Sequence, residues 1–269
     1  MSSSEERRAQ GAEVFSKLGG GAEPGAALVE ALEGLGALGQ IAVQQGAGAL
    51  WTRTELSRRD RSLIVIAALT GLGRERELRQ HLIGGLTHGL ERSEIDEVFV
   101  QVAAYAGMPC GLGGAVQFAG VLGERDGGAR HDTPSCLAAR SEADRRSAGL
   151  DVLSTLLGIP GADMQAPADA TVAQLGEMGR WVLDYAFGDV WSRPQLTRRD
   201  RSLVVVALLT ALNLTHELEI HLGGALNHGV TPEELDEVML TMVIYAGFPR
   251  AIDGKHLLDK VMAARGAAS

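Results

Sequence analysis

The chain has 269 residues, of which 45% are hydrophobic and 4% aromatic, and its formal net charge is −9. The acidic charge argues against binding to duplex nucleic acid, which needs a basic surface, and no Lys/Arg-rich tract suited to an anionic membrane is present. Two cysteines make no disulfide framework, residues 1–20 lack the apolar stretch of a signal peptide, and no apolar run approaches a membrane span, so we expect a soluble protein of the reducing cytoplasm.

The helices are expected in two sets, because the chain contains a second copy of part of itself. Residues 51–109 align with residues 191–249 at a constant offset of 140 without a gap, and 30 of the 59 pairs are identical. A repeat sets the unit of structure, and this one indicates two fused copies of one small domain. We place the first domain at residues 1–125, a linker at 126–141 and the second domain at 142–269.

In the first copy, a leading helix is expected over residues 7–20. The sequence Ser57-x-x-Asp60 is typical of a capping box, and it begins a helix that is apolar on all sides and should lie at the centre of its domain. The next helix begins near Glu75. A further helix has apolar residues at helical spacing and should end at Gly107 and Pro109.

The second copy repeats this order, with a leading helix over residues 145–158 and the capping sequence Thr197-x-x-Asp200. The segment Thr231-Pro232-Glu233-Glu234 supplies a cap, a proline at the first helical position and an acidic third residue. Strand signals are missing throughout. We therefore predict about six helices in each half and an all-α architecture.

An acid and a histidine four residues apart form the first candidate site in each half. Glu77 with His81, and Glu217 with His221, share one helix face. A carboxylate in that position can fix the imidazole tautomer and raise its basicity, as proton transfer requires. The alternative is a purely structural histidine, buried and satisfied by the neighbouring acid.

Other polar residues near these pairs have two interpretations each. The arginines of the repeated Arg-Asp-Arg-Ser segment, which include Arg61 and Arg201, can hold a carboxylate-bearing substrate or form an internal ion network. His88 and His228 each precede a glycine at a helix end, where a cationic side chain complements the helix dipole.

The two copies diverge after the shared proline. The first continues with small apolar residues, including Cys110, whereas the second carries Arg250, Lys255 and His256, which can bind an anion or form a solvated helix face. A zinc site fails on geometry, because His216 and His221 are five residues apart and point about 140° away from each other around a helix.

Together these residues resemble the carboxymuconolactone decarboxylase family, whose superfamily includes the alkylhydroperoxidase D proteins. The resemblance lies in Arg-Asp-Arg-Ser-Leu, in residues 216–221 with Glu217, in residues 227–234 and in residues 243–249, and more loosely across residues 58–109. It implies an all-helical fold that assembles as a trimer or hexamer of single-domain subunits. A tandem chain then looks like two such domains forming a pseudo-dimer, and we expect a homo-oligomer, a trimer of pseudo-dimeric chains.

The peroxidase branch of this superfamily uses a Cys-x-x-Cys pair followed by a histidine. The corresponding positions here are Arg74 and Glu77, or Leu214 and Glu217, so the thiols of a peroxidase cycle are missing. We interpret Cys110 as a small buried residue. The resemblance therefore favours the decarboxylase branch.

That branch implies a decarboxylase without metal or organic cofactor, acting on a small carboxylated lactone such as 4-carboxymuconolactone or a related unsaturated acid. His221 would donate the proton with Glu217 orienting it, and His81 and Glu77 would do the same in the first half. The residues expected to face the anionic substrate are Arg201, Arg61, Arg250, His216 and His256.

Two alternatives stay open at this point. The first is a tailoring enzyme of secondary metabolism that decarboxylates, dehydrates, isomerises or cyclises a larger polyketide-like substrate with the same acid–base pair. The second is a non-catalytic binding or assembly protein with degenerate sites.

Overall fold

The structure, a computed structural model, describes residues 3–126 and 140–268. The described residues form helices and no strands, which confirms the all-α expectation and the two tandem helical domains. Most of the predicted linker, including Cys136, lies outside the described residues. The exact domain boundaries stay a prediction. No helix in the described part of the chain combines the length and apolarity needed to cross a membrane.

Each half contains a leading set of helices, followed by the four helices of the repeat. The first half comprises α1 (Ser4–Leu18), α2 (Ala22–Glu33), α3 (Ala37–Ile41), η1 (Ala42–Leu50), α4 (Arg58–Gly71), α5 (Glu75–Thr87), α6 (Arg92–Ala106) and α7 (Met108–Asp126). The second half comprises α8 (Glu142–Leu157), η2 (Gly161–Asp163), α9 (Gln165–Leu175), α10 (Glu177–Trp181), η3 (Val182–Trp191), α11 (Arg198–Leu212), α12 (Thr215–Asn227), α13 (Pro232–Ala246) and α14 (Phe248–Ala268).

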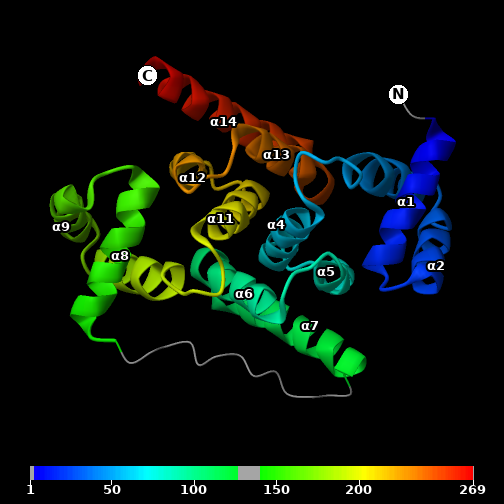
Figure 1. Cartoon of the computed structure of the whole chain (residues 1–269), viewed down its shortest axis with the longest axis horizontal. Helices are drawn as coiled ribbons and strands as arrows, with labels where there is room; N and C mark the ends of the chain where they lie inside the picture. The colour runs from blue at the N-terminus through cyan, green and yellow to red at the C-terminus, as the bar shows by residue number, and fades with distance from the viewer. Residues whose placement is uncertain (1–2, 127–139, 269) are drawn as a thin grey trace.

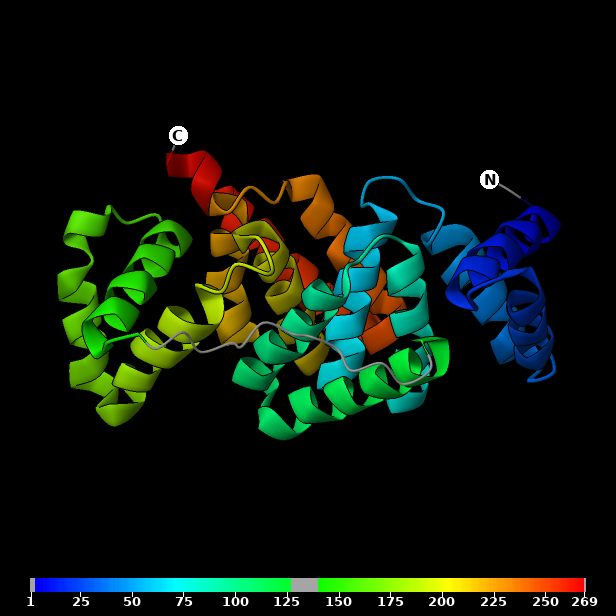
Figure 2. The ribbon, with the colours of Figure 1, turned by 60° about the horizontal axis from the view of Figure 1, so that its bottom comes forward.

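The centre of the molecule is the contact between α4 and α11, one from each half (Figure 1). Every residue from 60 to 70 and from 200 to 211 is buried, as the apolar composition of both segments predicts. The leading helices α1–α2 and α8–α9 lie at opposite ends of this core in both ribbon views (Figures 1 and 2). The two halves therefore share one continuous interior rather than two separate ones.

The helix caps follow the predictions with one informative difference. Thr231 and Glu234 form the complete capping box at the start of α13. At the starts of α4 and α11, Ser57 and Thr197 accept the expected bonds from the Asp60 and Asp200 amides. The two aspartate side chains, however, do not return to their own caps: they bind arginines of the opposite half.

The predicted stop before Gly107 and Gly247 is confirmed, since α6 and α13 end there with φ of 94° and 91°. Pro109 and Pro249, which we expected only to end a helix, lie instead in the first turns of α7 and α14. A proline is tolerated in a first turn because the amide it lacks would have no partner there.

Glycines allow the leading helix of each half to approach the π-helical segment that precedes the repeat. A Cβ at Gly11 would lie 2.3 Å from the Val43 carbonyl oxygen, and one at Gly48 would lie 2.0 Å from that of Arg7. Gly149 and Gly188 make the same close approach between α8 and η3. This contact fixes the ends of η1 and η3, where Trp51 and Trp191 enter the core.

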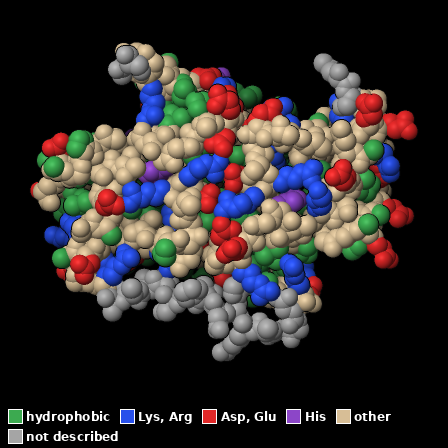
Figure 3. Space-filling view, in the orientation of Figure 1, with side chains coloured by type: hydrophobic (Ala, Val, Ile, Leu, Met, Phe, Trp, Pro, Cys, Tyr) green, Lys and Arg blue, Asp and Glu red, His purple; other side chains and the backbone are tan. Residues whose placement is uncertain are grey.

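The interface between the halves is built from reciprocal ion pairs. Arg59 binds Asp200 at 3.0 Å, and Arg199 binds Asp60 at the same distance. A symmetric contact of this kind is the signature of a twofold dimer interface, here contained in one chain. Positive and negative side chains alternate across the middle of the molecular face in Figure 3.

Two further arginines are buried completely inside this interface. Arg61 donates to Glu237 at 2.9 Å and to Thr241 at 2.7 Å, both on α13. Arg201 donates to Glu97 and Gln101 on α6, at 2.8 Å each. Arg61 therefore joins α4 to α13, and Arg201 joins α11 to α6.

Glu97 offers a direct test of this ion network, because it accepts bonds from both Arg193 and Arg201 while only 1% exposed. Glu97→Ala leaves two buried guanidinium groups without their carboxylate, and we expect the free energy of unfolding to fall by about 3–5 kcal/mol. Urea unfolding measures the change. The control, Glu177→Ala, removes an exposed carboxylate that pairs with Arg180. Equal stability losses in the two variants would contradict the role given to Glu97.

Candidate functional site

His81 and His221 each lie in a hydrogen-bonded chain that spans both halves. His81 on α5 faces Tyr245 of the second half, with 3.2 Å between its Nε2 and the tyrosine oxygen. The Trp51 indole N–H donates to the same oxygen at 2.9 Å. The histidine and tryptophan come from the first half and the tyrosine from the second, so neither half builds this cluster alone.

The second half repeats the arrangement with the contributions exchanged. His221 Nε2 lies 3.2 Å from the Tyr105 oxygen, and Trp191 donates to that oxygen at 2.9 Å. We call the two groups the histidine clusters: the first consists of Trp51, Ser62, His81, His88 and Tyr245, and the second of Trp191, Ser202, His221, His228 and Tyr105.

A tryptophan separates the two histidines in each cluster. The ring of Trp51 lies 5.6 Å from that of His81 and 5.5 Å from that of His88, and Trp191 has both histidine rings at 5.8 Å. His88 Nδ1 lies 2.8 Å from the Ser62 hydroxyl, and the second cluster repeats this contact at the same distance.

Burial keeps these imidazoles neutral. Loss of solvation, with a smaller effect of the nearby second histidine, lowers the pKa of His81 and of His221 to about 3. Burial followed by repulsion from a neighbouring arginine lowers the pKa of His88 and of His228 to about 4. His88 and His228 do lie at the helix ends, as predicted, but as neutral rings bonded to serine rather than as cations.

One ring nitrogen of each histidine in the two clusters has no hydrogen-bond partner among the described residues. His81 and His221 are only 8% and 6% exposed, and the Nδ1 atom of each is buried and has no hydrogen-bond partner among the described residues. Leaving a buried polar group unpaired costs about 1–3 kcal/mol. Nε2 is already held by tyrosine, so Nδ1 is the ring nitrogen left without a protein partner among the described residues.

The expected contact between acid and histidine is not made. Glu77 and Glu217 lie one turn before the histidines but are exposed, and neither bonds to its histidine, since Nδ1 is unpaired and Nε2 faces tyrosine. The shared helix face was predicted correctly. The histidine ring turns into the core, however, while the carboxylate stays in solvent.

The five residues expected to face an anionic substrate do not converge. Arg61 and Arg201 are completely buried in the interface, so the internal ion network, our other interpretation, describes their contacts. Arg250 donates to the Ala211 carbonyl at the end of α11. His216 and His256 are exposed on α12 and α14.

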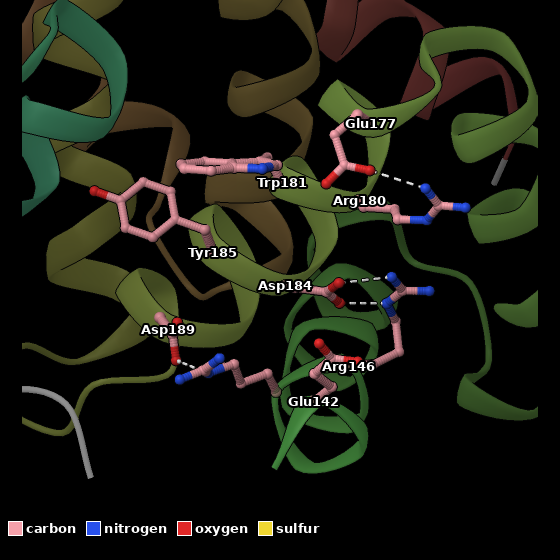
Figure 4. Close-up of a pocket in the computed structure, with 9 residues that line it drawn as sticks. Glu142, Arg146, Glu177, Arg180, Trp181, Asp184, Tyr185 and Asp189 are labelled. Carbon is pink, nitrogen blue, oxygen red and sulfur yellow. Dashed lines mark hydrogen bonds and ion pairs between the residues drawn. The ribbon is translucent and has the colours of Figure 1, made fainter. Parts of the chain in front are cut away.

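Three cavities among the described residues are lined by neither His81 nor His221. A cavity of about 560 Å³ lies between α8, α10 and η3, where Arg146 binds Asp184 and Trp181 stands beside Tyr185 (Figure 4). A second, of about 440 Å³, reaches a cluster through Trp191 and also contacts Arg193 and Arg198. His216 lines a third, of about 600 Å³, on the outer side of α12 and α14.

Comparison with known proteins identifies the fold family. The model of the carboxymuconolactone decarboxylase family matches residues 38–115 and, a second time, residues 176–260. The chain belongs to the carboxymuconolactone decarboxylase family. The two matches contain both histidine clusters, which confirms the resemblance found in the sequence.

Two relatives are decarboxylases by name. The chain is 34% identical over 125 residues to the 4-carboxymuconolactone decarboxylase of Acinetobacter baylyi (strain ATCC 33305 / BD413 / ADP1), an alignment covering 45% of this chain and 89% of the relative. It is 36% identical over 81 residues to the nitrosuccinic acid decarboxylase npaB of Metarhizium robertsii (strain ARSEF 23 / ATCC MYA-3075), covering 30% of this chain and 57% of the relative. The bacterial relative is thus matched almost entirely by less than half of this family member.

Sequence reasoning found the histidines but missed the residues that hold them in this family member. Tyr105, Tyr245, Trp51 and Trp191 lie within the repeat, but their positions in the sequence predict no contact with the histidines. One signal was available: in a chain with three tyrosines and three tryptophans, two of each occupy equivalent positions of the repeat. Among the described residues, no group of three or more His, Cys, Asp or Glu side chains is placed to hold a metal.

The neutral histidines predict a specific dependence of stability on pH. Folded His221 stays neutral down to about pH 3, whereas its ordinary pKa is 6.5, so the unfolded chain binds more protons between these values. The free energy of unfolding should therefore fall as the pH is lowered from 6.5 towards 3.

The variant His221→Gln tests this directly, because it should flatten that slope by up to about 1.4 kcal/mol per pH unit. Urea unfolding at several pH values between 7 and 4 measures the slope, and His256→Gln, which replaces an exposed histidine, serves as the control. An unchanged slope in His221→Gln would show that the folded protein does not hold this imidazole neutral.

Proposed function

We propose that this protein is a carboxy-lyase that removes carbon dioxide from a small anionic substrate without a metal or organic cofactor. The observation that carries the proposal is the histidine cluster: a buried neutral imidazole with one unpaired nitrogen, held by a tyrosine from the other half. Its membership of the decarboxylase family and the names of two relatives support the same reaction class.

The named substrates of the relatives have a chemical requirement in common. Loss of carbon dioxide from 4-carboxymuconolactone or from nitrosuccinic acid leaves a carbanion whose charge moves to an oxygen of the neighbouring lactone or nitro group. An enzyme for either reaction must stabilise that oxygen and then let a proton replace the lost carboxylate. We extend this requirement to the present chain, with a small carboxylated lactone or a related unsaturated acid as its substrate.

A neutral imidazole meets the first requirement. Its N–H can donate a hydrogen bond to the developing oxyanion without losing a proton of its own, as a histidine with a lowered pKa does in other enzymes. We therefore assign His221, and His81 in the first half, to oxyanion stabilisation. The new C–H bond takes its proton from solvent water, to which Glu217 and Glu77 are exposed one turn before the histidines.

This assignment changes the roles expected of the other candidates. Glu217 does not orient His221, because the two make no hydrogen bond. Arg61 and Arg201 hold the halves together, and their guanidinium groups are occupied by Glu237 and Glu97. Arg140, Arg193 and Arg198 line the cavity beside Trp191, and of these Arg193 is already bound to Glu97.

A second candidate function, a non-catalytic assembly protein, is favoured by one observation. Neither His81 nor His221 lines any of the three cavities described above, and both rings are packed against tryptophan and tyrosine. In that case the clusters would serve only to join the two halves. The two functions differ in their response to histidine substitution, because assembly predicts lost stability without any catalytic effect.

Measurement of carbon dioxide release from 4-carboxymuconolactone and from nitrosuccinic acid tests the proposal. Removal of one oxyanion donor lowers kcat by about 100-fold to 1000-fold in other enzymes. We expect a loss of that size from His221→Gln, from His81→Gln, or from the double variant if both clusters work. Lys260→Gln, which replaces an exposed residue paired with Glu219, is the control. Full turnover by the folded double histidine variant would refute the assignment.

We also propose that the chain assembles as a trimer of pseudo-dimers. Large apolar side chains are exposed on the short helices α3 and α10, where Leu38 is 72% and Trp181 62% exposed, and Phe248 at the start of α14 is 65% exposed. Large apolar side chains left exposed at these separate places are candidates for burial between neighbouring chains.

Light scattering in solution should therefore give three times the 28.3 kDa mass of one chain. The variant pair Leu38→Glu and Trp181→Glu should reduce the mass to that of one chain, while Ile220→Glu, on the outer face of α12, provides a matched apolar substitution elsewhere. A wild-type mass of a single chain would rule out the trimer.

A further inference from the structure

The tyrosine of each histidine cluster joins a donor to a ring nitrogen, and this has a consequence for the position of the proton. The Trp191 indole nitrogen can only donate, so the Tyr105 oxygen accepts that bond. Tyr105 has one proton of its own, and His221 Nε2 is the other partner that the structure gives its hydroxyl. The remaining question is which of the two, tyrosine or histidine, donates in the contact between them.

Counting unpaired groups decides between the two arrangements. If Tyr105 donates to Nε2, the neutral His221 carries its proton on Nδ1, and that single N–H is the only unpaired group. If Nε2 donates instead, the tyrosine oxygen accepts two bonds, its own proton has no acceptor among the described residues, and Nδ1 is unpaired as well. Because each unpaired buried group costs about 1–3 kcal/mol, the first arrangement is favoured.

We propose that Tyr105 fixes His221, and Tyr245 fixes His81, in the tautomer protonated on Nδ1, so that Nδ1–H is the group that faces the substrate. Each tyrosine is a positioning residue, supplied to the histidine by the opposite half. This inference rests on the proposed function only for the role of Nδ1–H in the reaction. The tautomer itself follows from the hydrogen bonds.

Two properties of the tyrosine support this role. Burial raises the pKa of Tyr105 and that of Tyr245, so both hydroxyls keep the proton that they donate. The ring of Tyr105 also stands edge-on to His221, with centroids 5.3 Å apart and planes at 76°, and Tyr245 stands at 80° to His81. This packing holds the imidazole in one orientation, which the tautomer needs if Nδ1 is to point away from the tyrosine.

The tautomer can be measured in the full chain without any substrate. In protein labelled with ¹⁵N at histidine, the chemical shifts of the two ring nitrogens separate a protonated from an unprotonated nitrogen, and His221→Gln identifies the signals of His221. We expect Nδ1 to be protonated in the wild type. Tyr105→Phe, which removes only the hydroxyl, should abolish that preference at His221 and leave His81 unchanged.

Matched variants separate the two clusters. Tyr245→Phe should change the signals of His81 and not those of His221. Tyr185→Phe, at the third tyrosine of the chain, removes a hydroxyl beside the cavity of Figure 4 and should change the signals of neither histidine. A wild-type His221 protonated on Nε2 would overturn the proposal.

Kinetics then test whether the tautomer matters for the reaction. If His221 works through Nδ1–H, Tyr105→Phe should lower kcat about tenfold with little change in KM. Its effect should disappear in a His221→Gln background but persist in a His81→Gln background, as a double-mutant cycle requires of residues that act together. Equal persistence in both backgrounds would contradict the assignment across halves.

The two measurements fail independently. If the wild-type protein releases no carbon dioxide from any acid tested, the proposed function is wrong, but the nitrogen shifts still decide the tautomer. If the shifts show Nε2–H while His221→Gln loses activity, the decarboxylase proposal stands and the role of the tyrosine is wrong.

Discussion

The structure depends on one contact, the packing of α4 against α11 with buried arginines reaching across it. Arg61 and Arg201 are completely buried, and each binds a buried glutamate of the opposite half, Glu237 and Glu97 respectively. Removing one partner of a buried charge pair is costly, because it leaves an uncompensated charge in the interior, so these pairs disfavour other arrangements of the halves. The halves therefore fit each other in one orientation.

That orientation also creates the histidine clusters. Tyr105 and Tyr245 lie in the last turns of α6 and α13, the same helices that carry the buried glutamates. The ion pairs therefore place each tyrosine beside the histidine of the opposite half. Chemistry and assembly thus share an interface. Fusion of the two copies keeps this interface intact at any concentration, since the second half is always close to the first.

The sequence predicts the parts of this structure that depend on local pattern. The buried central helices and the cap residues Ser57, Thr197 and Thr231 follow from periodicity and from residues three apart, and the structure confirms them, whereas Asp60 and Asp200 do not complete their capping boxes. Contacts between halves join residues 116 or 164 positions apart, and no local pattern contains that information. The Glu217–His221 pair shows the limit well: helical spacing places both on one face, but burial of the imidazole against Tyr105 decides which contact forms.

The differences between the halves are unevenly distributed, and this separates chemistry from its surroundings. Tryptophan, serine, both histidines and tyrosine are identical in the two clusters, and their distances agree within about 0.3 Å (5.5–5.8 Å for the ring contacts). Outside the clusters, however, the first turn of α7 has Cys110 near the Gly71 carbonyl, whereas the first turn of α14 has Arg250 bound to the Ala211 carbonyl. Two copies under no common requirement would have diverged inside the clusters as readily as outside them.

A similar contrast is found on the leading helices. The part of the Figure 4 cavity on α10 and η3 is lined by acidic, basic and aromatic side chains, whereas residues 37–49, which lie 140 positions earlier in the chain, carry no charge. A fold requirement would have kept these positions alike, as it kept the glycines of the close helix contact. The divergence therefore lies where a substrate or a neighbouring chain would approach, so the two clusters share one chemistry while their surroundings differ in what they admit.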